Sequence, residues 1–235
     1  MKNKFIIHII NNLLSQNISI FYLIFIYFMH RLENVLIRRF AMTLYIISCI
    51  VGYLLGSIPF GLIITYLAGV EDIRQIGSGN IGATNVLRTG HKFLALLTLL
   101  LDTSKAGLAA WLCCLFGNPE YGYLAGIFAV IGHNYPFWLH FQGGKGIAST
   151  LGLLLFMTPY VGIATCLTWL VVALIWHYSS LAALVALTTA PIYALIFNEP
   201  LVAIFSYALL CLLAFHTHRA NIQRLKDGTE GKISF

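Results

Sequence analysis

Charged side chains are scarce in this chain. Of its 235 residues only 9% are Asp, Glu, Lys or Arg, whereas 59% are hydrophobic. A soluble globular domain carries roughly 25% charged residues, so the scarcity excludes that class and indicates a polytopic membrane protein. The net charge of +6 therefore does not indicate a nucleic-acid partner, because Lys and Arg in a membrane protein mark the loops that face the cytoplasm.

The sequence also lacks the patterns of several familiar reactive sites. Its five cysteines all lie in apolar runs and form no CxxC pair or Cys/His cluster, so they are interpreted as small buried hydrophobic residues. No paired acidic cluster for a catalytic Mg²⁺ is visible. A GxSxG elbow, an His-x4-Asp dyad and a DxxDGxxAR-like run are missing as well. We therefore expect no metal site.

Long apolar runs dominate what is present. Seven of them follow Met42: Thr43–Ala68, Phe93–Phe116, Tyr121–Phe141, Ile147–Met157, Tyr160–Trp176, Leu181–Phe197 and Leu201–Phe215. With Met42 outside, every basic loop and the basic tail fall on one side of the membrane. We predict an all-α integral membrane protein with about seven (five to seven) transmembrane helices. Some are short or broken, because Ile147–Met157 spans only about half of the hydrocarbon.

The first 41 residues differ from the rest. The apolar run Ile18–Met29 is short for a membrane span and is followed by three arginines, which the sidedness above would leave on the wrong face. We interpret residues 1–41 as an N-terminal extension outside the fold, with Met42 as the natural start, and residues 42–235 as the functional domain. A genuine N-terminal membrane helix is the alternative.

The only long polar, glycine-rich interruption runs from Ile73 to Thr89, IRQIGSGNIGATNVLRT. Its glycines permit a positive φ and close backbone approach, and Arg74 and Arg88 add positive charge. Exposed backbone N–H groups near cations form an anion site, most simply for phosphate. An ordinary turn between two helices is the alternative.

Three further polar groups are predicted to meet this loop on the cytoplasmic side. Asp102 and Lys105 lie inside an apolar run, where ionisable residues are costly and commonly functional. His133 precedes the sequence Gly143-Gly144-Lys145-Gly146, a second flexible loop with its own cation. The tail adds His218 and Asn221, three residues apart and hence on one helical face.

Several phosphate-type sites at one membrane-embedded pocket suggest a reaction between two phosphate-bearing molecules. A transporter of phosphate or phosphorylated solutes remains the alternative, since it too would have broken helices and basic half-loops near the bilayer. Such transporters commonly show two similar halves, and this sequence shows none.

The quoted motifs together resemble one family. The stretches GSIPFG at 56–61, DIR at 72–74 and GSGNIGATN at 77–85, then Asp102–Gly107, Gly132–Gly146 and HRANIQRL at 218–225 with Gly228-Thr229-Glu230, occur in order. They resemble the bacterial acyl-phosphate-dependent glycerol-3-phosphate acyltransferases of the PlsY type. The resemblance covers residues 42–235, and members of that family usually begin near Met42.

The resemblance implies a multi-pass enzyme of the bacterial inner membrane, with its active site and C-terminus in the cytoplasm. Such an enzyme transfers an acyl chain from acyl phosphate to the 1-hydroxyl of glycerol 3-phosphate, giving lysophosphatidic acid and phosphate, the first step of phospholipid synthesis. It needs no cofactor, and a partner enzyme supplies the acyl phosphate.

The resemblance and the residue types also imply roles. The donor's phosphate is expected on the loop Ser78, Gly79, Asn80, Gly82, Ala83, Thr84 and Asn85, together with Ser57. Glycerol 3-phosphate is expected on Arg74, Lys145, His218 and Asn221, with Gly143 and Gly144 in the second anion-holding loop. Lys105 or Ser180 completes either site, and the hydroxyl proton goes to the leaving phosphate, to His133 or to His218.

Overall fold

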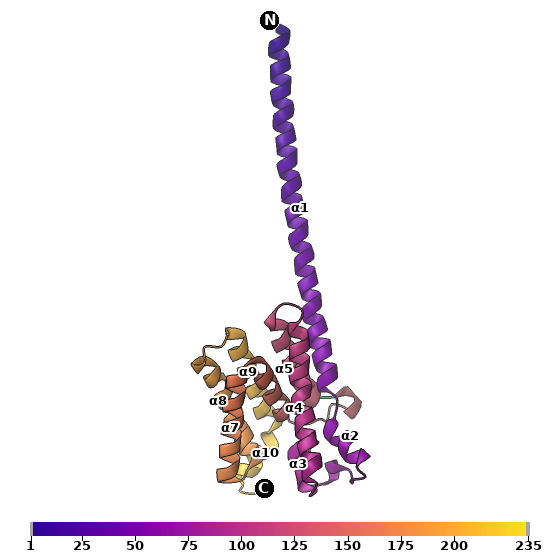
Figure 1. Cartoon of the computed structure of the whole chain (residues 1–235), viewed down its shortest axis with the longest axis vertical. Coiled ribbons are helices and arrows are strands. Elements are labelled where there is room, and N and C mark those ends of the chain that lie inside the picture. Colours follow the sequence, from indigo (N-terminus) through magenta and orange to yellow (C-terminus); the bar gives the residue numbers. More distant parts are fainter. Residues whose placement is uncertain (1, 234–235) are drawn as a thin grey trace. The chain divides into compact units, whose positions relative to one another are not determined.

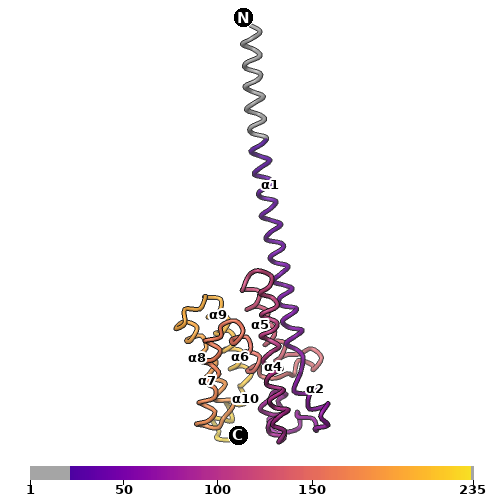
Figure 2. The backbone as a smooth tube through the Cα atoms, viewed as in Figure 1, coloured from indigo at the N-terminus to yellow at the C-terminus, as the bar shows by residue number. Residues whose placement is uncertain are grey.

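A computed structural model describes the backbone of residues 2–233 and the side chains of residues 22–233. The described backbone contains helices and no strand. It divides into two compact units, residues 1–44 and 45–235. The described residues of the first unit form one helix, of which the coloured indigo part is traced in Figure 2, and their described side chains are almost all exposed.

The second unit holds the remaining elements (Figure 1). In chain order they are the end of α1 (Lys2–Gly56), α2 (Phe60–Leu67), η1 (Ile73–Gln75), α3 (Ala83–Arg88), α4 (Lys92–Cys114), α5 (Pro119–Asn134), η2 (Phe137–Leu139), α6 (Ile147–Met157), α7 (Pro159–Trp176), α8 (Ser179–Ile196), α9 (Leu201–Thr217) and α10 (Arg219–Lys226).

Turn-forming residues set the helix boundaries. Asn118 caps α5, since its side-chain oxygen accepts a hydrogen bond from the N–H of Glu120 at 2.9 Å. Pro159 occupies the first turn of α7, and only Thr158 separates it from the end of α6. The breaks predicted at 117–120, 158–159 and 198–200 are therefore confirmed.

The run Thr43–Ala68 was expected to be a single helix, and that prediction is wrong. The helix ends at Gly56 and a new helix begins after Pro59, because a residue before proline avoids helical geometry.

Four helices within the described residues are long and apolar enough to cross a membrane, or five if α9 and α10, bent by 62°, form one broken span. The preferred count of seven is not reached by this measure, although five lies within the predicted range. The helix α6 is short, as expected, with 11 residues. Many large apolar side chains on α7, including Leu167, Leu170 and Leu174, are about half exposed, as is normal for a surface that contacts lipid.

The helix α4 is central to the packing around the site. It lies against α5, α6, α2 and α3, while α7 packs on α8 and α8 on α9 (Figure 1). The backbones of α4 and α6 approach closely at Gly152, where a Cβ atom would come within 1.8 Å of the carbonyl oxygen of Thr103. One turn away, the Ser149 hydroxyl donates to the carbonyl of Asp102 at 3.0 Å. This close approach fixes the part of α4 that carries Asp102 and Lys105.

The polar connections gather at one end of the second unit. In Figure 1, α3 and α10 lie at the end opposite the turn between α4 and α5. A cavity at that end is lined by residues from the loop before α3, the loop before α6, the start of α8 and α10. The loops that were predicted to share one side of the membrane thus meet around one cavity.

Candidate active site

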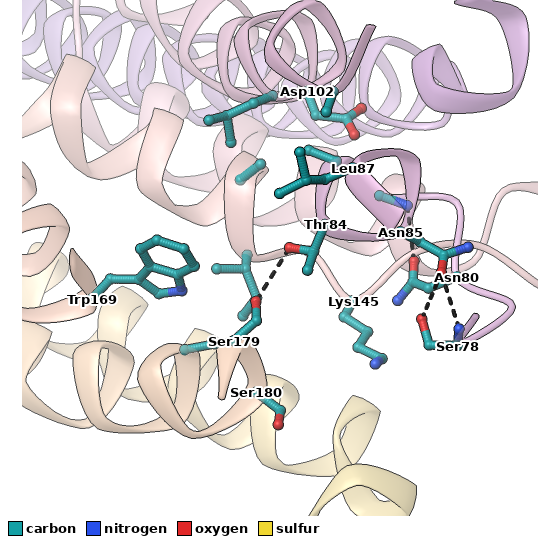
Figure 3. A pocket seen from close by; sticks show the side chains of 18 of the residues that line it. Ser78, Asn80, Thr84, Asn85, Leu87, Asp102, Lys145, Trp169, Ser179 and Ser180 are labelled. Atoms are coloured by element: carbon teal, nitrogen blue, oxygen red, sulfur yellow. Dashed lines mark hydrogen bonds between the residues drawn. The ribbon is translucent and has the colours of Figure 1, made fainter. Parts of the chain in front are cut away.

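A cavity of about 460 Å³ opens among α3, α4, α6, α7, α8 and α10. Its lining changes character from one end to the other. In the view of Figure 3, Lys145 projects into it between Ser78 and Ser180, and Trp169 lies at the other end from Ser78. Its apolar part is formed by side chains that include Leu96, Leu99, Ile147, Leu151, Cys166, Trp169 and Ala183. The cavity therefore suits a ligand with a polar head and a long apolar tail.

The apolar part is open to the outside of the bundle. Leu96 and Leu99 line the cavity and are also 52% and 41% exposed. Both project from α4, which is one of the helices long enough to cross a membrane. An acyl chain can therefore enter from the hydrocarbon without passing through water, where each exposed methylene costs ~0.8 kcal/mol.

The glycine-rich loop is held in shape by Asn85. Its side-chain oxygen accepts hydrogen bonds from the N–H and hydroxyl of Ser78, at 3.0 and 3.2 Å, and its amide nitrogen donates to the carbonyls of Ile73 and Ile76. Of the glycines that permit a positive φ, Gly77 and Gly79 adopt one, at 57° and 69°, whereas Gly82 has a φ of −85° at the start of α3. Because every polar atom of the Asn85 side chain is used, this residue shapes the loop.

A second cavity, of about 320 Å³, lies between the two glycine loops. The first loop contributes Ser78, Gly79 and Asn80, and the second contributes Gln142, Gly143, Gly144 and Lys145. Lys145, Ser78 and Asn80 line both cavities. Burial lowers the pKa of Lys145 to about 8, with the nearby Arg224 and Arg88 acting in the same direction and Glu230 opposing them. The ammonium of Lys145 thus lies where the two cavities meet and can bind an anion in either of them.

Lys105, Asp102 and His133 form a buried ionic cluster beside the second glycine loop. The ammonium of Lys105 is 2.8 Å from Oδ1 of Asp102 and 2.7 Å from Nδ1 of His133, and it donates to the carbonyl of Ile58 at 2.9 Å. An ammonium only donates hydrogen bonds, so Nδ1 of His133 accepts and Nε2 carries the proton. Gly144 packs against that ring, since a Cβ there would lie 2.0 Å from Nε2. Asp102 and His133 line the larger cavity, whereas Lys105 lies behind them.

His218 shows the opposite arrangement of its ring nitrogens. Its Nδ1 lies 2.8 Å from the carbonyl oxygen of Ala214, and a carbonyl only accepts, so Nδ1 carries the proton. His218 is 3% exposed and lines the cavity. In the neutral ring Nε2 is left as an acceptor. Of the two predicted catalytic histidines, His218 has the free lone pair.

A carboxylate to which the sequence analysis gave no role connects the remaining polar residues. Glu230 accepts hydrogen bonds from Ser180 at 2.7 Å, from Asn221 at 2.6 Å and from Arg224 at 2.7 Å. It lines the larger cavity with Ser180 and Asn221. The sequence offered one signal, the place of Glu230 in the C-terminal motif Gly228-Thr229-Glu230, but nothing in it indicated which residues the carboxylate contacts.

Most of the predicted site residues are brought together. The larger cavity is lined by Ser78, Asn80, Gly82, Ala83, Thr84, Asn85, His133, Lys145, Ser180, His218 and Asn221, and the smaller adds Gly79, Gly143 and Gly144. Ser57, Arg74 and Lys105 line neither cavity. The Ser57 hydroxyl donates to the carbonyl of Leu54 at 2.8 Å. Arg74 is half exposed and pairs with Asp72 at 2.6 Å. Arg88, by contrast, lines the larger cavity.

Apolar helices surround a cavity that is basic at one end and apolar at the other. This is the architecture of an integral membrane protein that handles amphiphilic, phosphate-bearing molecules. Residues 46–228 match the family described as glycerol-3-phosphate acyltransferase. The chain belongs to the glycerol-3-phosphate acyltransferase family.

Curated relatives and solved structures agree with this assignment. A glycerol-3-phosphate acyltransferase of Rhodospirillum rubrum is 54% identical over 195 residues, covering 80% of this chain and 90% of the relative. One from Paramagnetospirillum magneticum is 55% identical over 182 residues, covering 77% and 90%. The crystal structure of PlsY (YgiH), an integral membrane glycerol 3-phosphate acyltransferase in its glycerol 3-phosphate form, superposes with a TM-score of 0.76 at 35% identity, covering 81% of this chain and 96% of that one. Its lysophosphatidic acid form gives a TM-score of 0.75.

Proposed function

We propose that this enzyme transfers an acyl group from acyl phosphate to the 1-hydroxyl of glycerol 3-phosphate, giving lysophosphatidic acid and phosphate. The observation that carries the proposal is the larger cavity, in which Lys145 lies between Ser78 and Ser180 and an apolar channel continues toward Trp169. The relatives' names supply the acceptor, and the apolar channel beside two polar hollows fits an acyl donor that itself carries a phosphate.

The donor's phosphate would lie on the backbone of residues 78–82, next to the ammonium of Lys145, with its acyl chain in the channel. Glycerol 3-phosphate would place its phosphate against Lys145 and Arg88, two of the three lysine and arginine side chains that line the cavity; the third is Lys92. We assign Arg88 the role that the sequence analysis gave to Arg74, since Arg88 lines the cavity and Arg74 does not. Two cations between two phosphates offset the repulsion that would otherwise keep the substrates apart.

The reaction then needs little covalent chemistry from the protein. The 1-hydroxyl oxygen attacks the acyl carbonyl carbon, an ester bond forms, and the bond from that carbon to the phosphate oxygen breaks. The hydroxyl proton passes to the free Nε2 of His218 and from there to the departing phosphate. The donor is already activated, so the rate gain comes mainly from alignment and charge stabilisation. The His133 ring is held in place by the ammonium of Lys105, which also pairs with Asp102. Its Nε2 side supports the cavity wall at Gly144.

We place the catalytic domain in residues 42–235, in the bacterial inner membrane, with the polar end of the cavity facing the cytoplasm. The basic residues at that end are Arg88 of α3, Lys145 of the loop before α6, and Arg219 and Arg224 of α10. Such residues favour the cytoplasmic side. An enzyme that forms acyl phosphate is then required on the same side. The idea that Met42 is the natural start stays a prediction.

Purified protein in detergent, supplied with palmitoyl phosphate and radiolabelled glycerol 3-phosphate, tests the proposal. We expect labelled lysophosphatidic acid and one phosphate released per acyl chain transferred. Palmitoyl-CoA serves as the control donor and should give no product. Detergent leaves no closed compartment, so a transporter would form no acylated product. Absence of product from palmitoyl phosphate, or product from palmitoyl-CoA alone, would refute the proposed donor.

A further inference from the structure

The break between α1 and α2, at residues 57–59, deprives backbone carbonyls of the partners that a continuous helix would give them. Side chains from two other elements take their place. Trp138 of η2 donates its indole N–H to the carbonyl of Ser57 at 2.7 Å, and Lys105 of α4 donates to the carbonyl of Ile58 at 2.9 Å. Irregular backbone inside a membrane is tolerated only where its polar groups find partners in the protein. These two side chains therefore hold the break in one geometry.

The short helix η2 is attached to the end of α1 by further contacts. The Phe137 ring stacks on that of Tyr53, with centroids 6.5 Å apart, and the Tyr53 hydroxyl donates to the carbonyl of Tyr135 at 2.8 Å. A Cβ atom on Gly132 would lie 2.3 Å from the carbonyl oxygen of Tyr53, so α5 and α1 touch backbone to backbone. Trp138 itself is 42% exposed. Its indole therefore fills no core position, and its specific contribution is the N–H donor.

The helix η2 also contacts the first glycine loop (residues 77–85). Leu139 of η2 packs, together with Leu62 of α2, against a buried cluster that includes Ile81. On the α2 side of the break, a Cβ atom on Gly61 would come within 2.0 Å of the carbonyl oxygen of Ile81. A shift of η2 or of α2 is therefore passed on to the first loop, because a close-packed interior leaves no room to absorb it.

From η2 the chain continues directly into the second glycine loop (residues 142–146). Between them His140 and Phe141 both have a positive φ, of 50° and 61°, which is unfavourable for residues other than glycine and persists only where the surrounding structure holds it. The place of η2 therefore determines where the second loop and its Lys145 lie. Since η2 contacts one loop and leads into the other, it controls the distance between them.

We propose that Trp138 is a positioning residue, whose hydrogen bond to the carbonyl of Ser57 sets the spacing of the two glycine loops and so the width of the smaller cavity between them. The inference rests on the proposed function, in which the donor's phosphate lies on the first loop next to Lys145 of the second. Without the indole N–H, the carbonyl of the buried Ser57 has lost its partner and η2 is released from the break. The donor's phosphate then loses contact with one of the loops, whereas glycerol 3-phosphate keeps Arg88 in the larger cavity.

Trp138→Phe tests the role of the N–H, because it keeps an aromatic ring and removes the donor. The KM for palmitoyl phosphate should rise by about threefold to tenfold, the range for losing one hydrogen bond, while the KM for glycerol 3-phosphate should change by less than about twofold. Trp138→His should largely restore the KM for palmitoyl phosphate. In its five-membered ring Nε2 takes the position of the indole Nε1 and carries a proton in one neutral tautomer. If only aromatic bulk mattered, phenylalanine would instead be the better replacement.

Trp111→Phe is the matched control. Trp111 lies on α4, is 52% exposed, and its side chain forms no hydrogen bond within the described residues, so both KM values should stay those of the unaltered enzyme. Leu139→Ala is a second variant, which keeps the Trp138 donor but removes a contact with the core of the first loop. It should also raise the KM for palmitoyl phosphate, and it decides the matter if Trp138→Phe does not fold.

Three kinetic outcomes overturn the inference. The first is an unchanged KM for palmitoyl phosphate in Trp138→Phe or in Leu139→Ala. The second is an equal rise in Trp138→Phe and Trp138→His, which would make the N–H irrelevant. The third is a rise of the same size in Trp111→Phe.

A binding measurement separates this inference from the proposed function. Inorganic phosphate, added at constant ionic strength, should raise the midpoint of thermal unfolding of the unaltered enzyme in detergent, because a ligand of the folded state stabilises it. The rise should be smaller in Trp138→Phe and close to full in Trp138→His and Trp111→Phe. That pattern without any acyl transfer would overturn the proposed function and leave the inference standing. Acyl transfer with an equal shift in all four proteins would overturn the inference alone.

Discussion

Nζ of Lys105 and Nδ1 of His133 lie 2.7 Å apart inside the bundle, joining α4 to α5. Asp102 completes the group, with Oδ1 2.8 Å from the same ammonium. All three side chains are at most 5% exposed. A buried charge is tolerated only when it is paired, so the cluster links the membrane-embedded part of α4 to the wall against which Gly144 packs.

Lys105→Met should be strongly destabilising. Removing one partner of a buried ion pair leaves the other charge uncompensated and costs ~3–5 kcal/mol. The double variant Lys105→Met/Asp102→Asn removes both charges and should recover part of that loss. Thermal unfolding in detergent measures both, and equal midpoints for the single and double variants would show that the leftover charge is not the cause.

The pH dependence of catalysis should report on Lys145. Its pKa is lowered by burial to about 8, and only the protonated form attracts phosphate. The kcat/KM for glycerol 3-phosphate, which reflects the free enzyme, should therefore fall by about tenfold for each pH unit above that value. Below a pH of about 8 the lysine is charged, so kcat/KM should not fall for this reason.

Lys145→Arg provides the control for the pH profile. Arginine stays protonated throughout the accessible range, so the alkaline fall of kcat/KM should disappear even if the absolute value is lower. An unchanged alkaline limb in Lys145→Arg would assign the titration to another group.

Much of the fold could be predicted from the sequence because membrane helices depend on long apolar stretches and on breakers. The expected α6 at 147–157 matches the observed bounds, and Pro159 and Pro200 mark real turns. The break at Ser57–Pro59 was missed because the apolar character continues across it. The preferred count of seven exceeds the four or five candidate spans among the described residues, because several apolar segments are shorter than a membrane span, while five lies within the predicted range.

The site was predictable where the polar residue type itself indicated function. Glycine loops and Lys145 stand out in an apolar chain, and the structure gathers them around two cavities. The choice between Arg74 and Arg88 depends on local partners, since Asp72 holds the Arg74 guanidinium two residues away. The contacts of Glu230 span up to 50 residues of sequence, and no local pattern reveals such a distance.

The two arginines of the glycine-rich stretch can be separated experimentally. Arg88→Gln should reduce kcat/KM for glycerol 3-phosphate by about tenfold to a hundredfold, the range for losing a hydrogen bond to a charged group at ~1.5–3 kcal/mol. Arg74→Gln should have a much smaller effect, because that side chain is half exposed and paired with Asp72. A larger loss in Arg74→Gln than in Arg88→Gln would restore the assignment made from the sequence.

The apolar channel should set the preferred acyl length, and two neighbouring residues of α7 can test this. Cys166 lines the cavity, whereas Leu167 does not line it and is 55% exposed on the outer surface. Cys166→Phe adds bulk inside the channel and should displace the end of a long chain. Two displaced methylenes correspond to ~1.6 kcal/mol and about a tenfold loss of kcat/KM.

That loss should appear with a 16-carbon acyl phosphate and be small with an 8-carbon one, because the shorter chain does not reach the blocked part. Leu167→Phe adds a bulkier side chain to the same helix on the lipid-facing side, so its ratio of long-chain to short-chain kcat/KM should match that of the unaltered enzyme. Measuring the ratio for all three proteins removes any common effect on folding or yield. Equal losses for both chain lengths in Cys166→Phe would mean that the acyl chain follows another path out of the polar end.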